Sequence, residues 1–306
     1  MSLASQAPRA FILDFDGTIT VKDTIGVLGN FGIDWQTKRG RDVKGVWDEV
    51  VEAYERDFES HVGGYKTVKG EKRRTLNEEV RYYRGLREIE ERSFRRVSDS
   101  GLFKGISKED WKGGGRQAVE KGDVVVRKGF KSFLERVKEG GGVLGIISVN
   151  FSSSFIRGVV VASSGPKREE TDVLANESGE DGVLVGPKSE SRGVIATSDA
   201  KLASMKDILK SWNSRVSMET SRPIYIGDSG TDIECLMEPG VIGIVISDDG
   251  HSSLMQTLQR IGVEVVHIGD YGDNESAGER RYWARDFEEI LQSSVFTQSQ
   301  LVVHAQ

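Results

Sequence analysis

The chain has 306 residues, of which 37% are hydrophobic and 29% are charged, and it carries a formal net charge of −6. This length suits one large α/β domain with a sizeable insertion, or two domains. A mildly acidic chain has no general electrostatic attraction for nucleic acid or for an anionic membrane, so neither is expected as a partner.

The number of cysteines and the length of the apolar runs predict the compartment in which the protein resides. Cys235 is the only cysteine, so no intrachain disulfide can form, and a reducing compartment fits. The first ten residues contain no apolar segment of signal-peptide length, and no apolar run approaches the roughly 20 residues of a transmembrane helix. We therefore expect a cytoplasmic protein.

The first predicted element is a buried strand near the N-terminus. Residues 10–16 read AFILDFD, an apolar run that ends in two aspartates and is typical of a strand buried on both faces of a parallel sheet. From about Trp35 to Gln117 the chain is rich in Glu, Arg and Lys, with apolar residues at helical spacing and no strand-like run. This pattern predicts a helical module of about four helices.

Strands and helices then alternate to the end of the chain. A helix over residues 129–138 precedes a buried strand over 143–147, and a helix and strand are expected over 155–163. Residues 176–192 look like a hairpin or loop excursion, and 200–212 like a helix. Further strands are predicted at 223–228, 241–246 and 263–268, with a helix starting within 231–237. Such alternation predicts a doubly wound parallel sheet.

Polar residues follow three of these strands, at Asp14 and Asp16, at Ser148 and at Asp228. In such sheets, ligands bind beyond the carboxyl ends of the strands at a switch in strand order. A carboxylate at Asp14 suits a nucleophile, and Asp16 suits protonation of a leaving oxygen and deprotonation of water. The competing interpretation is an ordinary capped turn, which Asp and Thr also favour.

A second acidic cluster lies in GDSGTD, residues 227–232. Asp228 and Asp232 are four residues apart across a turn that enters a helix, so both can face one site. Clustered carboxylates without nearby histidines suit a hard cation with oxygen ligands, and Mg²⁺ is the ion that we expect. The same two acids could instead cap the helix, where the dipole favours them.

A hydroxyl group and an amine complete the predicted site. Ser148 could donate a hydrogen bond to a phosphoryl oxygen, helped by the backbone that leads to Asn150. Lys201 opens a helix after a polar loop and could neutralise phosphate charge from there. On spacing alone, Lys188 and Lys206 are alternatives.

In this order, the pieces resemble the four motifs of the haloacid dehalogenase superfamily: DFDGT from Asp14, ISVN around Ser148, Lys201, and GDSGTD. The resemblance implies a Rossmann-like core and a Mg²⁺-dependent phosphatase. Asp14 would be the nucleophile and Asp16 the general acid/base. The implied phosphate-binding residues are Thr18, Ser148, Asn150 and Lys201. The implied Mg²⁺ ligands are Asp14, the backbone carbonyl of Asp16, Asp228 and Asp232.

The helical segment resembles a cap of this superfamily inserted after the first strand. We therefore predict an all-helical cap over residues 23–122 and a core formed by 1–22 and 123–306. TITVKDT after the first motif, and VLANESGEDGVLVGP before Lys201, resemble the phosphoserine-phosphatase-like branch. That branch carries an acidic substrate contact at the position of Asp23, although Asp23 could equally cap a helix.

The expected activity is hydrolysis of a small phosphorylated metabolite through an aspartyl-phosphate. The acid at Asp16 favours phosphoryl transfer, because dehalogenases of the superfamily lack it. One alternative is a phosphomutase that uses the same nucleophile on a sugar phosphate. Another is a non-catalytic regulatory protein that retains the fold. The identity of the substrate and the oligomeric state are not predicted by these motifs.

Overall fold

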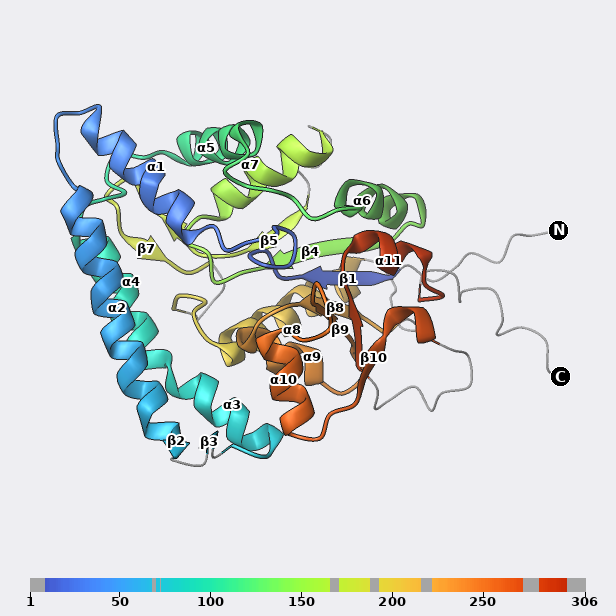
Figure 1. Ribbon diagram of the computed structural model, residues 1–306. Helices are drawn as coiled ribbons and strands as arrows, with labels where there is room; N and C mark the ends of the chain where they lie inside the picture. The colour runs from blue at the N-terminus through green and yellow to red at the C-terminus, as the bar shows by residue number, and fades with distance from the viewer. Residues whose placement is uncertain are drawn as a thin grey trace, which may run out of the picture.

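The computed structural model describes residues 9–67, 70–71, 73–165, 171–187, 193–215, 222–271 and 281–295. Their centre is a seven-stranded parallel sheet with the order β10-β11-β9-β8-β1-β4-β5 (Figure 1). The strands are β1 Ala10–Leu13, β4 Val143–Ile147, β5 Asp172–Leu174, β8 Ile224–Gly227, β9 Ile242–Ile246, β10 Val265–His267 and β11 Arg281–Ala284. The predicted doubly wound α/β fold is confirmed.

Strand β1 is the third strand from the β5 edge of the sheet and pairs with β4 on one side and β8 on the other. The chain builds outward from β1 in both directions, so the switch in strand order falls at β1. Because ligands bind at such a switch, the residues after β1 face the favoured crevice.

Helices cover both faces of the sheet. Helices α5 Lys108–Lys121, α6 Phe130–Glu139, α7 Ser153–Ser164 and α11 Phe287–Gln292 lie on one side, and α8 Ser198–Arg215, α9 Ile233–Met237 and α10 Ser253–Arg260 lie on the other (Figure 1). Phe11 and Leu13 pack into the first hydrophobic cluster, whereas Ala10 and Ile12 pack into the second. This alternation is the two-residue period of a strand buried on both faces.

The segment between β1 and β4 is mostly helical, as predicted. It contains α1 Ile25–Thr37, α2 Lys44–Tyr65, α3 Leu76–Gly85, α4 Arg87–Asp99 and α5, followed by α6. A short antiparallel pair, β2 Lys66–Thr67 and β3 Gly70–Glu71, was not predicted and connects α2 to α3. Helix α5 packs tightly on α7. Gly115 in α5 has no side chain, and a Cβ at this position would lie only 2.2 Å from the carbonyl oxygen of Phe155 in α7.

Three further differences from the sequence expectations concern short elements. Residues 155–163 belong to the single helix α7, and the strand β5 comes later. Strand β11 was not predicted, since its RYWA sequence begins with an arginine. A hairpin within 176–192 is confirmed by β6 Glu177–Ser178 and β7 Leu184–Val185; residues 188–192 lie outside the described residues.

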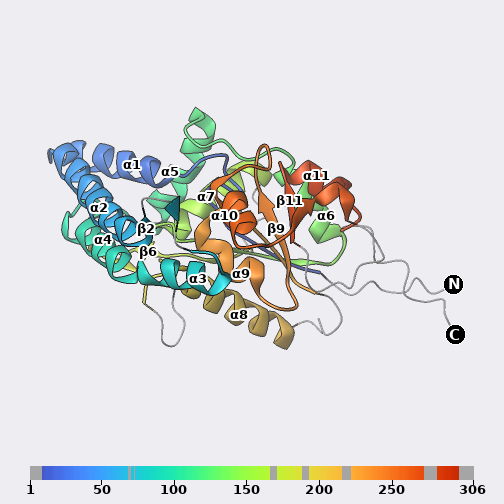
Figure 2. The ribbon, with the colours of Figure 1, turned by 60° about the horizontal axis from the view of Figure 1, so that its bottom comes forward.

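Helix α3 and the start of α4 contact the core beside the crevice. Arg84 forms an ion pair with Glu234 in α9, and Arg87 forms one with Asp199 at the start of α8. The ring of Tyr83 lies against Gly230, where a Cβ would come within 1.9 Å of the Tyr83 Cζ. The inserted helices are therefore attached to the core at α3, as Figure 2 shows. No helix in the described part of the chain is long and apolar enough to cross a bilayer.

Candidate active site

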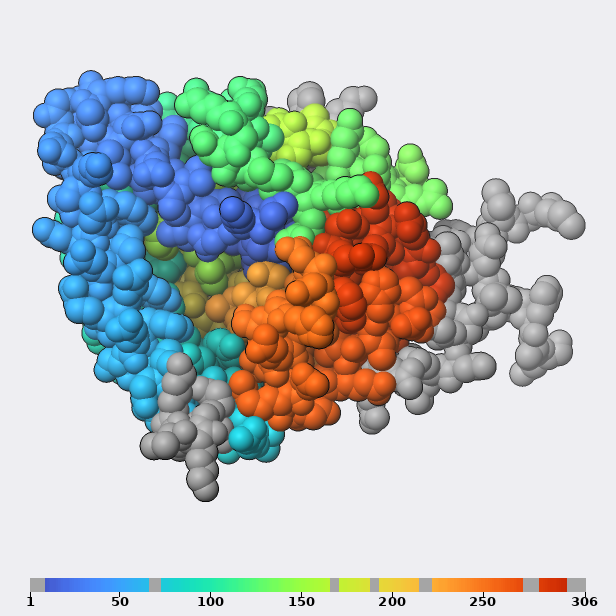
Figure 3. All heavy atoms as spheres, viewed as in Figure 1, coloured from blue at the N-terminus to red at the C-terminus, as the bar shows by residue number. Residues whose placement is uncertain are grey.

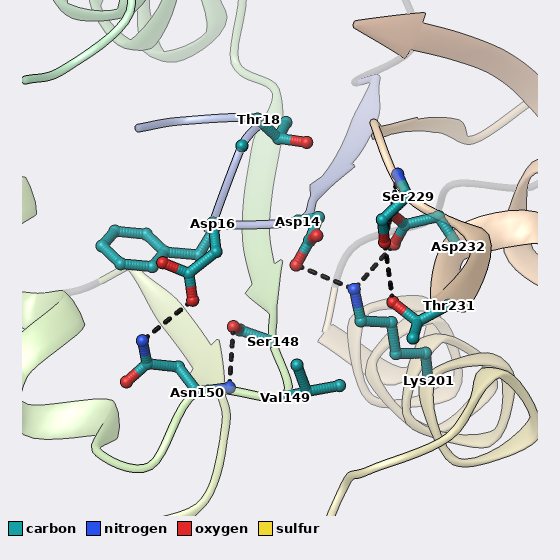
Figure 4. A network of polar contacts seen from close by, with 12 residues as sticks. Asp14, Asp16, Thr18, Ser148, Val149, Asn150, Lys201, Ser229, Thr231 and Asp232 are labelled. Carbon is teal, nitrogen blue, oxygen red and sulfur yellow. Dashed lines mark hydrogen bonds and ion pairs between the residues drawn. The ribbon is translucent and has the colours of Figure 1, made fainter. Parts of the chain in front are cut away.

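The polar strand ends converge as predicted (Figure 4). Asp14 follows β1, Ser148 follows β4, and Asp228 follows β8, and these three strands are neighbours in the sheet. Oxygen atoms from Asp14, Asp228 and Asp232 all lie within 4.8 Å of one another. Acids more than 200 residues apart in the sequence thus share one site.

Lys201 lies in the first turn of α8 and is fully buried against two of these acids. Its Nζ lies 2.9 Å from Asp14 Oδ1 and 2.8 Å from Asp232 Oδ1. Burial alone would lower the pKa of Lys201, but the charges of Asp14 and Asp232 outweigh burial and raise it. Lys201 is therefore an ammonium ion next to the predicted nucleophile.

Asp232 is held by protein donors on both carboxylate oxygens. Oδ1 accepts hydrogen bonds from Lys201 Nζ and Tyr225 OH, at 2.8 and 2.7 Å. Oδ2 accepts them from the backbone N–H groups of Asp228 and Ser229 and from the Ser229 hydroxyl. Burial would raise the pKa of Asp232, but Lys201 and these donors lower it. The carboxylate orients Lys201 and the turn after β8, and has little capacity left for a metal ion.

The carboxylate oxygens of Asp14 and Asp228 accept fewer hydrogen bonds than those of Asp232. Burial and the charge of Asp232 raise the pKa of Asp14 well above its usual range and raise that of Asp228 to about 7. Asp14 Oδ1 forms its ion pair with Lys201 but has no aligned hydrogen-bond donor. Two buried carboxylates and the half-buried Asp228 face one ammonium, so a divalent cation would balance the remaining charge, and oxygen ligands suit Mg²⁺. The residues present therefore fit the ion that the motifs imply.

Asp16 points away from Asp14, toward the start of α1 (Figure 4). Its Oδ1 accepts hydrogen bonds from Thr24 N at 2.8 Å and Thr24 Oγ1 at 2.6 Å, and Oδ2 accepts one from Asn150 Nδ2 at 2.9 Å. Burial and the nearby charge of Asp23 raise the pKa of Asp16 to about 6, against these donors. Such a carboxyl group exchanges a proton readily near neutral pH.

Two predicted phosphate-binding residues contact acids in the structure. Thr18 Oγ1 donates to Asp228 Oδ1 at 2.7 Å, and Asn150 Nδ2 donates to Asp16. Ser148 is buried beside them, and its Oγ accepts a hydrogen bond from the Asn150 N–H at 3.1 Å. A direct contact of these side chains with phosphate stays a prediction.

The alternative lysines and Asp23 have other surroundings. Lys206 is exposed and forms an ion pair with Glu238, so it does not face the crevice acids. Lys188 lies outside the described residues. Asp23 Oδ1 accepts a hydrogen bond from Ile25 N at the start of α1, which is the cap role considered above. A substrate contact at Asp23 stays a prediction.

Several residues that shape the site were not identified from the sequence. Thr24 orients Asp16, and Tyr225 orients Asp232. Asn176 donates to the carbonyl groups of Val149, Asn150 and Ile195, and so fixes the backbone after Ser148. Thr24 closely follows the first motif, and this position is a signal in the sequence. The other two lack a local signal, because polar side chains are common in such positions.

Comparison with known proteins gives distant relatives. No protein-family model matches the chain. The chain is 26% identical over 270 residues to the bifunctional TH2 protein, mitochondrial, of Arabidopsis thaliana. The alignment covers 83% of this chain and 42% of that protein. It is 24% identical over 254 residues to cold tolerance protein 1 of Saccharomyces cerevisiae, covering 77% of each. The chain thus spans less than half the length of the first of these curated relatives.

A solved structure shares the architecture of this chain. Cytosolic 5′-nucleotidase IIIB bound to cytidine superposes with a TM-score of 0.53 at 12% identity, covering 96% of this chain and 86% of that one. A substrate-bound phosphoserine phosphatase gives a TM-score of 0.49 at 16% identity, covering 93% and 97%. The chain has the haloacid dehalogenase-like fold with a helical insertion after the first strand. Likeness at such low identity establishes the fold and leaves the activity to the site.

Proposed function

We propose that this protein is a Mg²⁺-dependent phosphatase that hydrolyses a small phosphomonoester through a phosphorylated Asp14. The proposal rests on one observation: the buried Asp14 carboxylate lies within one ion's reach of Asp228 and 2.9 Å from the Lys201 ammonium. A nucleophile, a cation site and a fixed positive charge are the groups that phosphoryl transfer requires.

In the first step, an Asp14 carboxylate oxygen attacks phosphorus, and the bond from phosphorus to the leaving oxygen breaks. Asp16, with a pKa of about 6, donates its proton to that oxygen. Lys201 and a Mg²⁺ ion held by Asp14 and Asp228 would offset the negative charge on the phosphoryl oxygens.

In the second step, water attacks the phosphorus of the aspartyl-phosphate while Asp16 takes up a proton from that water. The bond from phosphorus to the Asp14 oxygen breaks, which releases inorganic phosphate and regenerates both carboxyl groups. In the structure the hydrogen bonds from Thr24 and Asn150 hold the Asp16 carboxyl group away from Asp14, so both proton transfers require Asp16 to rotate toward the reacting oxygen.

The inserted helices border a hollow on one face of the molecule. Figure 3 shows a hollow between the blue inserted helices and the orange part of the core, with green and yellow residues from the middle of the chain visible in it. Helices beside such a hollow would limit access of large substrates. We infer a small phosphorylated metabolite in the cytoplasm as the substrate, of a class that the fold does not specify.

The test is release of inorganic phosphate from p-nitrophenyl phosphate and from a panel of phosphorylated metabolites, with and without Mg²⁺. We expect Mg²⁺-dependent turnover by the natural protein and none by Asp14→Asn, which keeps the shape of the side chain but removes the nucleophile. Folding of both proteins is compared by circular dichroism. A folded natural protein that binds Mg²⁺ and releases no phosphate from any substrate would contradict the proposal.

A further inference from the structure

Arg127 lies outside all the motifs, yet its side chain is almost completely buried and reaches four acceptors. Nε donates to the Thr18 carbonyl at 3.1 Å, and Nη2 donates to the Gly17 carbonyl at 2.8 Å. Nη1 donates to the Asp248 carboxylate at 2.7 Å and to the Arg285 carbonyl at 3.1 Å. A planar guanidinium with five N–H donors suits such bridging, whereas an ammonium group does not.

The backbone of Arg127 is anchored beside the same loop. Arg127 N donates to the Ile19 carbonyl at 2.8 Å, and Val21 N donates to the Val125 carbonyl at 2.9 Å. Thr20 and Val126 form an antiparallel bridge between these two hydrogen bonds. Arg127 is thus fixed at its Cα, and its side chain extends back over the turn formed by Gly17 and Thr18.

That turn touches Asp228 through two successive residues. Thr18 Oγ1 donates to Asp228 Oδ1 at 2.7 Å, and a Cβ at Gly17 would lie only 2.2 Å from Asp228 Oδ2. Because the turn and the Asp228 carboxylate are in direct contact, a displacement of the turn moves Asp228 or breaks its hydrogen bond with Thr18.

We propose that Arg127 is a positioning residue, and this inference rests on the proposed phosphatase function. Arg127 connects the Gly17–Thr18 turn to two other loops at the carboxyl edge of the sheet, through Asp248 after β9 and Arg285 after β11. The turn in turn holds the Asp228 carboxylate where it shares a cation with Asp14. Arg127 therefore acts on the reaction through the cation site, without touching the substrate.

The experiment compares Arg127→Met and Arg127→Lys with Arg285→Met as a matched control. The Arg285 side chain is 60% exposed and pairs with Glu289 on the surface, and only its backbone carbonyl meets Arg127. The measurements are kcat and KM for p-nitrophenyl phosphate, the Mg²⁺ concentration for half-maximal activity, and Mg²⁺ affinity by titration calorimetry. Circular dichroism and thermal melting report folding.

We expect both Arg127 variants to lower kcat by about 10- to 100-fold, the size of effect that misplacement by about 1 Å produces. They should weaken Mg²⁺ binding several-fold and leave KM within about threefold, since the substrate is not contacted. Arg285→Met should match the natural protein in kcat, in KM and in both measures of Mg²⁺ binding. A purely structural role for Arg127 would lower the melting temperature without moving kcat or Mg²⁺ affinity.

Folded Arg127 variants with unchanged kcat and unchanged Mg²⁺ affinity would overturn the inference. If Arg127→Met does not fold, the lysine variant decides the question. A natural protein that releases no phosphate, yet binds Mg²⁺ more tightly than its Arg127 variants, would refute the phosphatase and keep the positioning role. A natural protein without Mg²⁺ binding would overturn both.

Discussion

Gly17→Ala is a sharp test of how closely the first-motif turn fits against the cation site. Gly17 has φ +75°, and an added Cβ would lie 2.2 Å from Asp228 Oδ2. Gly40 provides a matched control, because it has the same φ of +75° and no atom within 4 Å of its Cβ position. Both substitutions place alanine in the left-handed region, which costs about 1–2 kcal/mol, but only the first one forces a clash.

The magnitude of the effect follows from these distances. Ordinary van der Waals contact of a Cβ begins at 3.4 Å, so the turn or the Asp228 carboxylate must shift by about 1 Å to accommodate the added methyl group. Misplacement of a reacting group by about 1 Å lowers rates by about 100-fold. We therefore expect Gly40→Ala to keep the kcat of the natural protein and Gly17→Ala to lose about two orders of magnitude, with weaker Mg²⁺ activation.

The assay is phosphate release over a range of Mg²⁺ concentrations, with thermal melting of both variants. The backbone cost should lower the two melting temperatures by similar amounts, about 2–4 °C for each kcal/mol in a large domain. If Gly17→Ala and Gly40→Ala have equal kcat and equal Mg²⁺ dependence, the turn is not tightly coupled to Asp228 and the reasoning is wrong.

Three further predictions concern single ionisable groups. Asp16→Asn should lower kcat by about 10²- to 10⁴-fold, the usual contribution of an acid/base group, and should remove from the pH–rate profile the inflection near the Asp16 pKa of about 6. Lys201→Met should abolish activity and lower the free energy of unfolding by about 3–5 kcal/mol, because the substitution leaves the buried Asp232 carboxylate without its cation. Urea unfolding without Mg²⁺ measures the loss of stability, and an unchanged unfolding midpoint would contradict the prediction. Glu90 accepts a hydrogen bond from Tyr54 at 2.9 Å in the inserted helices, and burial raises its pKa from 4.5 to about 7. Its contribution to stability is therefore fully present below pH 4.5 and is lost as the pH rises through 7, a loss of about 3 kcal/mol. Glu90→Gln should remove that part of the pH dependence in urea unfolding at about pH 5 and about pH 8, on either side of the Glu90 pKa, and identical profiles for the two proteins would refute the assignment.

The sequence was sufficient for the parts of the fold that follow from local patterns. Strands β1, β4, β8 and β9 are apolar runs that end at polar residues, and a strand buried on both faces must have that composition. Strands β5 and β11 were missed because three or four residues beginning with Asp172 or Arg281 give no such run. Their pairing depends on the rest of the sheet.

The residues of the candidate site also fall into those that local sequence patterns predict and those that they do not. Asp14 and Asp228 could be predicted because each directly follows a strand, and the ends of parallel strands meet at one edge. Arg127 could not, because its acceptor at Thr18 is 109 residues away and only the folded chain brings them together. The contacts of Thr18 and Asn150 with acids were also missed, since a motif names the residues of a site and leaves open which partner each side chain takes.

The attachment of α3 and the start of α4 to the core has a consequence for protein engineering. Arg84 and Arg87 bind Glu234 and Asp199, and Glu234 also accepts a hydrogen bond from Ser198, three residues before Lys201. A chimera that receives its inserted helices from another protein would therefore present foreign side chains to the segments that carry the buried lysine. Exchanging these helices for new specificity should succeed only when both arginines, or matching partners on α8 and α9, are transferred with them.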